Sequence, residues 1–307
     1  MRYLSLLWNA QVVSILSLFA AIVWMLRNEK DKVRVYLVLA LLVNLFFGLL
    51  LNVGMSEENS LFPLKYDWIL FHLDNALGIT ATSLARHLQG ALTFPLRIVY
   101  NLMLPMMIAW IPITGYRTPR GSVVLAYVAE LVLGPLSYAV VPACGPLYAF
   151  GKLWLQPPTP RVSVMHLAGL PNAFPSLHVA SAIVLVLFAR GGVWRAIALL
   201  FLTGTAMTTM GLGEHYLIDL FPGIVFGCFA AAVGQLRLRR ALVFLGFVLF
   251  WLVAARFGYN ILIAHAAIVQ ALAAVSVMAA LAMVIEAWRS PERGDRREVS
   301  AALIAAD

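Results

Sequence analysis

The sequence predicts an all-α fold, a polytopic bundle of membrane helices with about nine spans. Of the 307 residues, 62% are hydrophobic and only 12% are charged, whereas soluble domains carry about 25% charged residues. The mean hydropathy is +0.89. Several apolar runs have about 20 residues, the length an α-helix needs to cross a bilayer core of about 30 Å, whereas the strands of a barrel would alternate over about 10 residues.

The nine apolar runs define the predicted spans. They cover roughly 8–26, 35–53, 92–114, 122–143, 176–190, 194–212, 215–236, 241–256 and 262–286. The first run lacks a strongly basic leader and a convincing small-residue cleavage site, which favours a retained span over a signal peptide.

The orientation follows from the Lys and Arg residues, which concentrate in cytoplasmic loops. When the cluster from Arg27 to Arg34 is placed in the cytoplasm, alternation puts most of the 22 cations on that side. The N-terminus is then outside and the C-terminus in the cytoplasm. The net charge of +8 is spread over short clusters between spans, which argues against a nucleic-acid partner. The sequence has only two cysteines, Cys144 and Cys228, which does not favour a disulfide framework.

Two outer segments interrupt the spans. Residues 54–91 are too polar to span and predict a helical segment in the outer interface, which we interpret as a lid without chemistry. Residues 144–175 contain Gly145-Pro146 and Pro157-Pro158, which prevent a continuous helix. Because this segment leads into Pro175-Ser176, it is the expected wall of a site.

His178, His215 and Asp219 are the candidate catalytic residues. The fifth and seventh spans both begin on the outer side, so His178 and His215 are expected at one depth, facing each other across a gap that fits a phosphorus atom. His215 and Asp219 are four residues apart, which stacks them on a helix. A carboxylate on one ring nitrogen fixes the tautomer and leaves the other nitrogen free to attack. Residues after Ser176 start a helix, where unpaired N–H groups favour phosphate.

These motifs resemble a known family. Phe174-Pro175-Ser176-Leu177-His178 and His215-Tyr216-Leu217-Ile218-Asp219 resemble the second and third signatures of the type-2 phosphatidic acid phosphatase superfamily. Two weaker stretches, Pro142–Phe150 and Asp74–Gly78, are similar to the branch of inositol-phosphorylceramide and sphingomyelin synthases. The resemblance covers about 70–235.

The resemblance implies a fold and an activity. The fold is a six-helix core in 35–240, with an extra span and first loop in 1–34 and two extra spans and a tail in 241–307. The activity is lipid phosphotransfer without metal or other cofactor, in which His215 is the nucleophile, Asp219 its orienter and His178 the general acid. A phospholipid or lipid phosphate is the expected substrate, and a lipid alcohol is a possible acceptor. The expected location is a multi-pass membrane protein with an extracytoplasmic site.

The sequence departs from the superfamily at the phosphate-binding positions. The Lys and Arg of the first signature are not recognisable, and Thr208-Thr209 replaces the Ser-Arg of the third. Lys152 and Arg161 are the best outer-face substitutes, with Arg86 and Arg97 behind them. The candidate substrate-binding residues are Ser176, Lys152, Arg161, Tyr148, Asn172 and Tyr216.

Other interpretations stay open. Transfer to water would make the protein a lipid phosphate phosphatase, and sequence separates the two poorly because the acceptor depends on water exclusion. A transporter could use the intramembrane residues Asp219 and Glu130, together with the histidines, to relay protons or bind a solute. A zinc site at His178, His215 and Asp219 lacks a His-x-x-x-His pair or a cysteine set.

Overall fold

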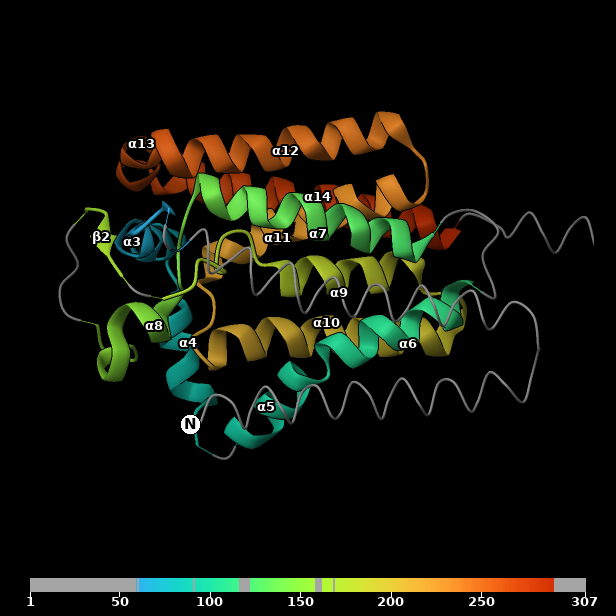
Figure 1. The fold of residues 1–307 in the computed structure, drawn as a ribbon, viewed down its shortest axis with the longest axis horizontal. Coiled ribbons are helices and arrows are strands. Elements are labelled where there is room, and N and C mark those ends of the chain that lie inside the picture. The colour runs from blue at the N-terminus through green and yellow to red at the C-terminus, as the bar shows by residue number, and fades with distance from the viewer. Residues whose placement is uncertain are drawn as a thin grey trace, which may run out of the picture.

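The computed structural model describes residues 59, 61–90, 92–115, 122–157, 162–167 and 169–289. The predicted spans 8–26 and 35–53 and residue Arg161 lie outside these ranges. The described chain is a helical bundle whose strands form one short antiparallel pair, β1 (Leu64–Lys65) with β2 (Met165–His166) (Figure 1). The predicted all-α membrane bundle is therefore confirmed.

The helices that form the body of the bundle run mostly along its length (Figure 1). They are α5 (Thr93–Asn101), α6 (Met103–Gly115), α7 (Val123–Val140), α9 (Leu177–Phe188), α10 (Gly191–Gly211), α11 (Leu217–Gly234), α12 (Leu238–Phe257) and α14 (Ala266–Arg289). Shorter elements are α3 (Asp67–Leu77), α4 (Ala81–Leu88), α8 (Pro146–Phe150), η1 (Gly151–Leu153) and α13 (Tyr259–Ala264). Figure 1 shows α3, α8, α13 and β2 together at one end of the bundle.

Six helical segments of the described chain are long and apolar enough to cross a membrane. They are Thr93–Ile111, which joins α5 to α6, and α7, α10, α11, α12 and α14. Each corresponds to a predicted span, so the protein is embedded in the membrane and passes through it several times. The last predicted span, 262–286, differs in detail: α13 ends at Ala264, and His265 separates it from α14.

The run predicted as the span 176–190 forms a short central helix. Helix α9 has 12 residues, which gives it a length of about 18 Å. Its residues are all buried except His178. The helix ends at Phe188 because Ala189 is extended and Gly191 has a φ of +73°, a backbone that starts α10 in a new direction. Protein, and not lipid, therefore surrounds most of α9.

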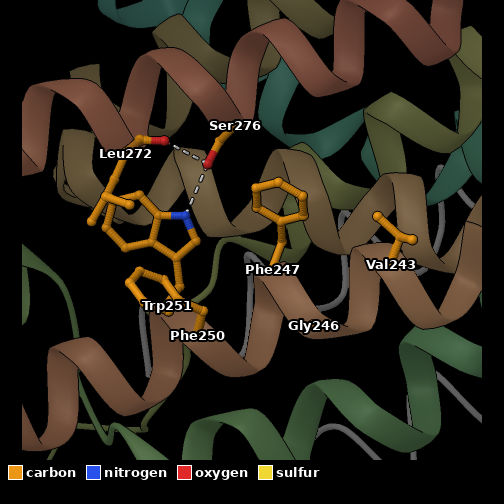
Figure 2. A pocket seen from close by; sticks show the side chains of 7 residues that line it. All are labelled: Val243, Gly246, Phe247, Phe250, Trp251, Leu272 and Ser276. Atoms are coloured by element: carbon orange, nitrogen blue, oxygen red, sulfur yellow. Dashed lines mark hydrogen bonds between the residues drawn. The ribbon is translucent and has the colours of Figure 1, made fainter.

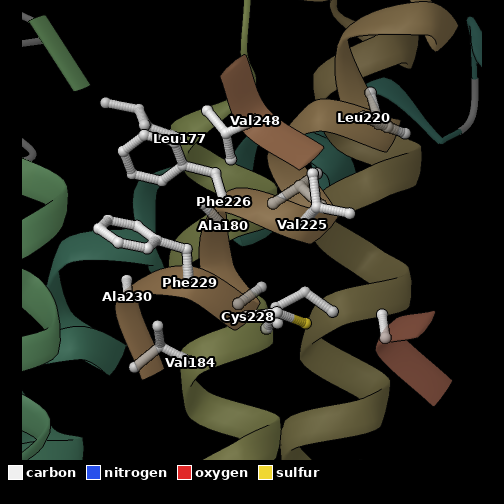
Figure 3. Close-up of a cluster of buried hydrophobic side chains, with 14 of the residues drawn as sticks. Leu177, Ala180, Val184, Leu220, Val225, Phe226, Cys228, Phe229, Ala230 and Val248 are labelled. Atoms are coloured by element: carbon white, nitrogen blue, oxygen red, sulfur yellow. The ribbon is translucent and has the colours of Figure 1, made fainter. Parts of the chain in front are cut away.

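Helix α11 packs closely against both α9 and α12. Their buried side chains, shown in Figure 3, include Ala180 and Val184 of α9, Phe226 and Phe229 of α11, and Val248 of α12. The contact depends on small residues, since a Cβ at Gly227 would collide with the carbonyl oxygen of Ala180. A Cβ at Gly223 would likewise lie 2.5 Å from the carbonyl oxygen of Ser176. The glycines let the start of α9 pack against the middle of α11.

An apolar pocket of about 360 Å³ lies between α12 and α14. Trp251 closes one side of it by donating from Nε1 to the Ser276 hydroxyl at 2.9 Å, and Ser276 donates to the carbonyl of Leu272 (Figure 2). The other lining residues are Val243, Gly246, Phe247 and Phe250. None of the candidate catalytic residues lines this pocket.

Candidate active site

His215 lies in the turn between α10 and α11 and is fully buried. The backbone N–H groups of Glu214 and His215 both donate to the carbonyl of Thr209, at 2.9 and 3.1 Å, which fixes this turn. The Nδ1 atom of His215 is 2.8 Å from the carbonyl oxygen of Ala173. A carbonyl only accepts, so Nδ1 carries the proton and neutral His215 has its lone pair on Nε2.

His178 stands in the first turn of α9, and its ring meets that of His215. Ser176 caps this helix by accepting from the backbone N–H of Val179 at 3.4 Å. The Nδ1 atom of His178 lies 3.3 Å from Nε2 of His215, a hydrogen-bond distance. A face of the His178 ring is stacked on Tyr100 of α5, with centroids 4.9 Å apart. The structure therefore brings the two predicted histidines together, in direct contact and without a phosphorus-sized gap between their nitrogens.

Burial decides the charge of His215. Burial and the positive charge that His178 can carry lower the pKa of His215 to about 3, against the opposing effect of the Ala173 carbonyl. The imidazole is therefore neutral at physiological pH. A neutral ring with a lone pair on Nε2 is the form that can attack an electrophile.

Asp219 lies beside His215 but does not hold its ring by a hydrogen bond. Its Oδ2 atom is 3.5 Å from Nδ1 of His215 and accepts the backbone N–H of Tyr216 at 2.7 Å. The short contact to Nδ1 comes from the carbonyl of Ala173 instead. The expectation that Asp219 fixes the tautomer is corrected: the backbone carbonyl does so, and Asp219 places a carboxylate next to the ring.

Two further carboxylates, on α3, hold the backbone around the site. Asp74 accepts from the N–H groups of Leu217, Ile218 and Ala81 at 3.1, 2.7 and 2.8 Å. The first two are unpaired N–H groups of the first turn of α11. Asp74 is 1% exposed, and burial raises its pKa to about 7 against the lowering effect of these hydrogen bonds.

Asp67 ties the loop after α7 to the same site. It accepts from the backbone N–H groups of Cys144 and Gly145 and from the hydroxyl of Tyr216, the last at 3.0 Å. Burial raises the pKa of Asp67 to about 6, and the same hydrogen bonds oppose this rise. These contacts give α3, within the predicted outer segment 54–91, a positioning role that the interpretation as a lid did not include. The spacing of Asp67 and Asp74 could have predicted these roles. The two residues are seven positions apart, which places them on one face of a helix.

Glu214 is the charged residue closest in the chain to His215. It is 9% exposed and accepts a hydrogen bond from the hydroxyl of Tyr148 at 3.2 Å, and Tyr100 lies close enough to affect its pKa. Burial raises the pKa of Glu214 to about 7, although both tyrosines lower it. The sequence analysis assigned no role to Glu214 or Tyr100. The only local signal was the position of Glu214 directly before His215.

The predicted substrate-binding residues occupy different environments. Tyr148 is 41% exposed and contacts Glu214, whereas Tyr216 and Ser176 are fully buried and bond to Asp67 and to the start of α9. Lys152 is exposed in η1. The Oδ1 atom of Asn172 is buried without a hydrogen-bond partner among the described residues. Arg161 lies outside the described residues.

Glu130 lies deeper in the bundle, on α7. It is fully buried, and its Oε2 atom accepts from the hydroxyl of Ser181, one turn along α9 from His178, at 2.7 Å. For the zinc alternative, no group of three or more His, Cys, Asp or Glu side chains with the arrangement of a metal site occurs in the part of the chain that the structure describes.

Comparison with known protein families shows to which family the chain belongs. A family model described as the PAP2 superfamily matches residues 68–233, more than half of the chain. The protein belongs to the PAP2 superfamily. The matched range begins in α3 and ends in α11, so it includes Asp74, His178 and the turn with His215. No curated protein and no solved structure gave a match. Family and fold together identify a membrane protein of the phosphatase type.

Proposed function

We propose that this PAP2 protein is a lipid phosphotransferase that works through a phosphohistidine at His215. It would cleave a lipid phosphoester and pass the phosphorus-bearing headgroup to the hydroxyl of a second lipid. The observation that supports this most is the lone pair of His215 Nε2, set by the Ala173 carbonyl and directed at a second imidazole. A nucleophile with an adjacent acid–base group is the arrangement that covalent catalysis requires.

In the first half of the reaction, Nε2 of His215 attacks phosphorus. The P–N bond forms, the bond from phosphorus to the lipid oxygen breaks, and that oxygen takes a proton from His178, which is protonated when the anionic phosphate enters the site. General acid catalysis of this kind contributes about 10²–10⁴-fold. The phosphorylated ring is cationic, and the carboxylate of Asp219, 3.5 Å from Nδ1, stabilises it.

In the second half, the acceptor hydroxyl gives its proton to His178 and its oxygen attacks phosphorus. The P–N bond breaks, which returns His215 to its neutral form and leaves His178 protonated for the next cycle. His178 has to move off the line between the two rings to admit phosphorus, because its Nδ1 is in hydrogen-bond contact with Nε2. The stacked ring of Tyr100 limits that movement to one side.

Transfer to a lipid rests on the resemblance to the sphingolipid synthase branch. The stretch Pro142–Phe150 that carries part of this resemblance lies against the catalytic turn, since Leu147 donates from its backbone N–H to the carbonyl of Gly213 at 2.8 Å. Transfer to water is the second candidate, and the superfamily's phosphatase chemistry favours it. In both cases we propose an extracytoplasmic site, from the distribution of the cations.

The test is turnover by the purified protein of a phospholipid labelled in its phosphate, with and without a lipid alcohol. A new labelled lipid supports the transferase, and free labelled headgroup or phosphate supports the hydrolase. His215→Ala is expected to abolish both products and His178→Ala to lower them at least about 100-fold. His87→Ala, a change at an exposed histidine of α4, is the control and should keep full activity.

A covalent intermediate gives a second measurement. Rapid quenching in alkali should leave label on the wild-type protein in an acid-labile form and none on the His215→Ala variant. If no phosphoester is turned over, or if His215→Ala keeps near wild-type activity, the proposal is wrong. Solute flux in proteoliposomes that Asp219→Asn abolishes would then favour the transporter.

A further inference from the structure

An acidic residue, Glu214, adjoins the histidine pair in the chain. Glu214 directly precedes His215, and Tyr100, whose ring is stacked on His178, lies close enough to Glu214 for each to shift the pKa of the other. Glu214 is therefore separated from the acid–base imidazole by one aromatic ring. Tyr148 of α8 holds the carboxylate from a second side at 3.2 Å.

The two threonines that replace the Ser-Arg of the third signature bring no positive charge toward this carboxylate. Thr208 donates its hydroxyl to the carbonyl of Leu96 at 2.9 Å, and Thr209 donates its hydroxyl to that of Ala206 at 3.2 Å. Lys65 is buried, and its ammonium donates to the carbonyl of Phe62. None of the ion pairs between described residues joins a Lys or Arg to Glu214, His178 or His215.

We propose that Glu214 is a specificity-determining residue that selects phosphodiester lipids over phosphomonoester lipids. This inference rests on the proposed phosphotransferase function and names the class of its phosphorus donor. A phosphomonoester carries a charge of about −1.5 to −2 at pH 7, whereas a phosphodiester carries −1. A carboxylate near the bound phosphorus repels the second charge, and in a partly dehydrated site this repulsion is stronger than in water.

The chemistry of transfer agrees with this selection. With a diester, attack by His215 releases the lipid alcohol and leaves the headgroup attached to phosphorus, ready for a new hydroxyl. With a monoester, the same attack leaves a bare phosphoryl group, which is the intermediate of a phosphatase. A residue that discriminates between the two donors therefore also biases the enzyme toward headgroup transfer.

The selection should depend on pH. Burial raises the pKa of Glu214 to about 7, so the carboxyl is neutral below that pH and ionised above it. The titratable groups around it are Tyr148 of α8, Tyr100 of α5, the adjacent His215, and His178 of α9 behind Tyr100. As the pH rises through 7, the preference for diesters should increase.

The experiment compares kcat/KM for a lipid phosphomonoester and a phosphodiester with an uncharged headgroup, using the full-length protein. Glu214→Gln should raise the monoester-to-diester ratio about tenfold, the effect of removing roughly one charge–charge contact worth one pKa unit. Glu214→Ser removes the charge in a smaller volume and should act in the same direction. Glu214→Asp keeps the charge and should keep the ratio within about twofold.

The pH profile separates Glu214 from the substrate. A phosphomonoester itself ionises near pH 6, and the Glu214→Gln profile records that contribution alone. The wild-type ratio should fall more steeply with pH than the variant ratio. An unchanged ratio in both Gln and Ser variants that still turn over both lipids would overturn the inference and leave the phosphotransferase standing. Absence of turnover of either lipid by the wild type would instead reject the function itself.

Discussion

At the scale of single residues, a backbone carbonyl prepares the candidate nucleophile. The Ala173 carbonyl oxygen accepts a hydrogen bond from Nδ1–H of His215, a role that an acidic side chain has in catalytic triads. A carbonyl cannot be protonated at physiological pH, so the tautomer of His215 does not depend on the ionisation of a partner. Asp219 is left to act through its charge.

This division of labour predicts the effect of Asp219→Asn. Where an aspartate sets the tautomer, its replacement by asparagine costs about 10⁴-fold in kcat. Here the tautomer survives and only the charge beside the phosphorylated ring is lost, so we expect kcat to fall about 100-fold with little change in KM. Steady-state kinetics on the labelled phospholipid measure both values. A loss as large as that of His215→Ala would show that Asp219, and not Ala173, controls the ring.

At the scale of elements, α3 fixes the start of α11 and thereby the position of His215. Asp74→Ala would leave the buried N–H groups of Ala81, Leu217 and Ile218 without their acceptor. We expect the free energy of unfolding to fall by about 3 kcal/mol and kcat to fall in the fraction that stays folded. Thermal unfolding in detergent and kinetics measure the two effects. Asn75→Ala, at the exposed neighbouring position, should change neither, and an equal loss there would contradict this role of Asp74.

The contact between α9 and α11 makes a prediction about glycine. Gly227→Ala would force a Cβ against the Ala180 backbone and to 2.8 Å from Cβ of Ile183, so the helices must separate. We expect destabilisation of about 1–3 kcal/mol, the usual cost of overpacking. Gly246→Ala on α12 is the matched control, since nothing lies within 4 Å of its added Cβ, and a gain of up to about 1 kcal/mol follows from helix propensity. Equal melting temperatures for the two variants would contradict the packing argument.

At the scale of the whole molecule, the sequence predicted what is encoded locally. Span lengths follow from continuous apolar runs, and the meeting of His178 with His215 followed from the alternation of spans. The short, buried α9 could not be predicted, because its run resembles that of a lipid-facing span and only its neighbours decide its burial. The roles of Asp67, Asp74 and Glu214 were missed for the same reason, since their partners lie in other parts of the chain, such as Tyr216, Leu217 and Tyr100.

The orientation of the bundle in the membrane is a prediction at this scale. Lys152 in η1 belongs to the end that carries the candidate site, and Arg239 lies at the start of α12, at the opposite end of the bundle (Figure 1). Both are exposed, whereas the natural cysteines Cys144 and Cys228 are buried and should not react with a membrane-impermeant maleimide. In intact cells, Lys152→Cys should be labelled and Arg239→Cys only after permeabilisation, because cations cluster on the cytoplasmic side. If only Arg239→Cys is labelled in intact cells, the orientation is reversed and the site lies in the cytoplasm. If both variants are labelled in intact cells, the bundle does not cross the membrane between these two ends.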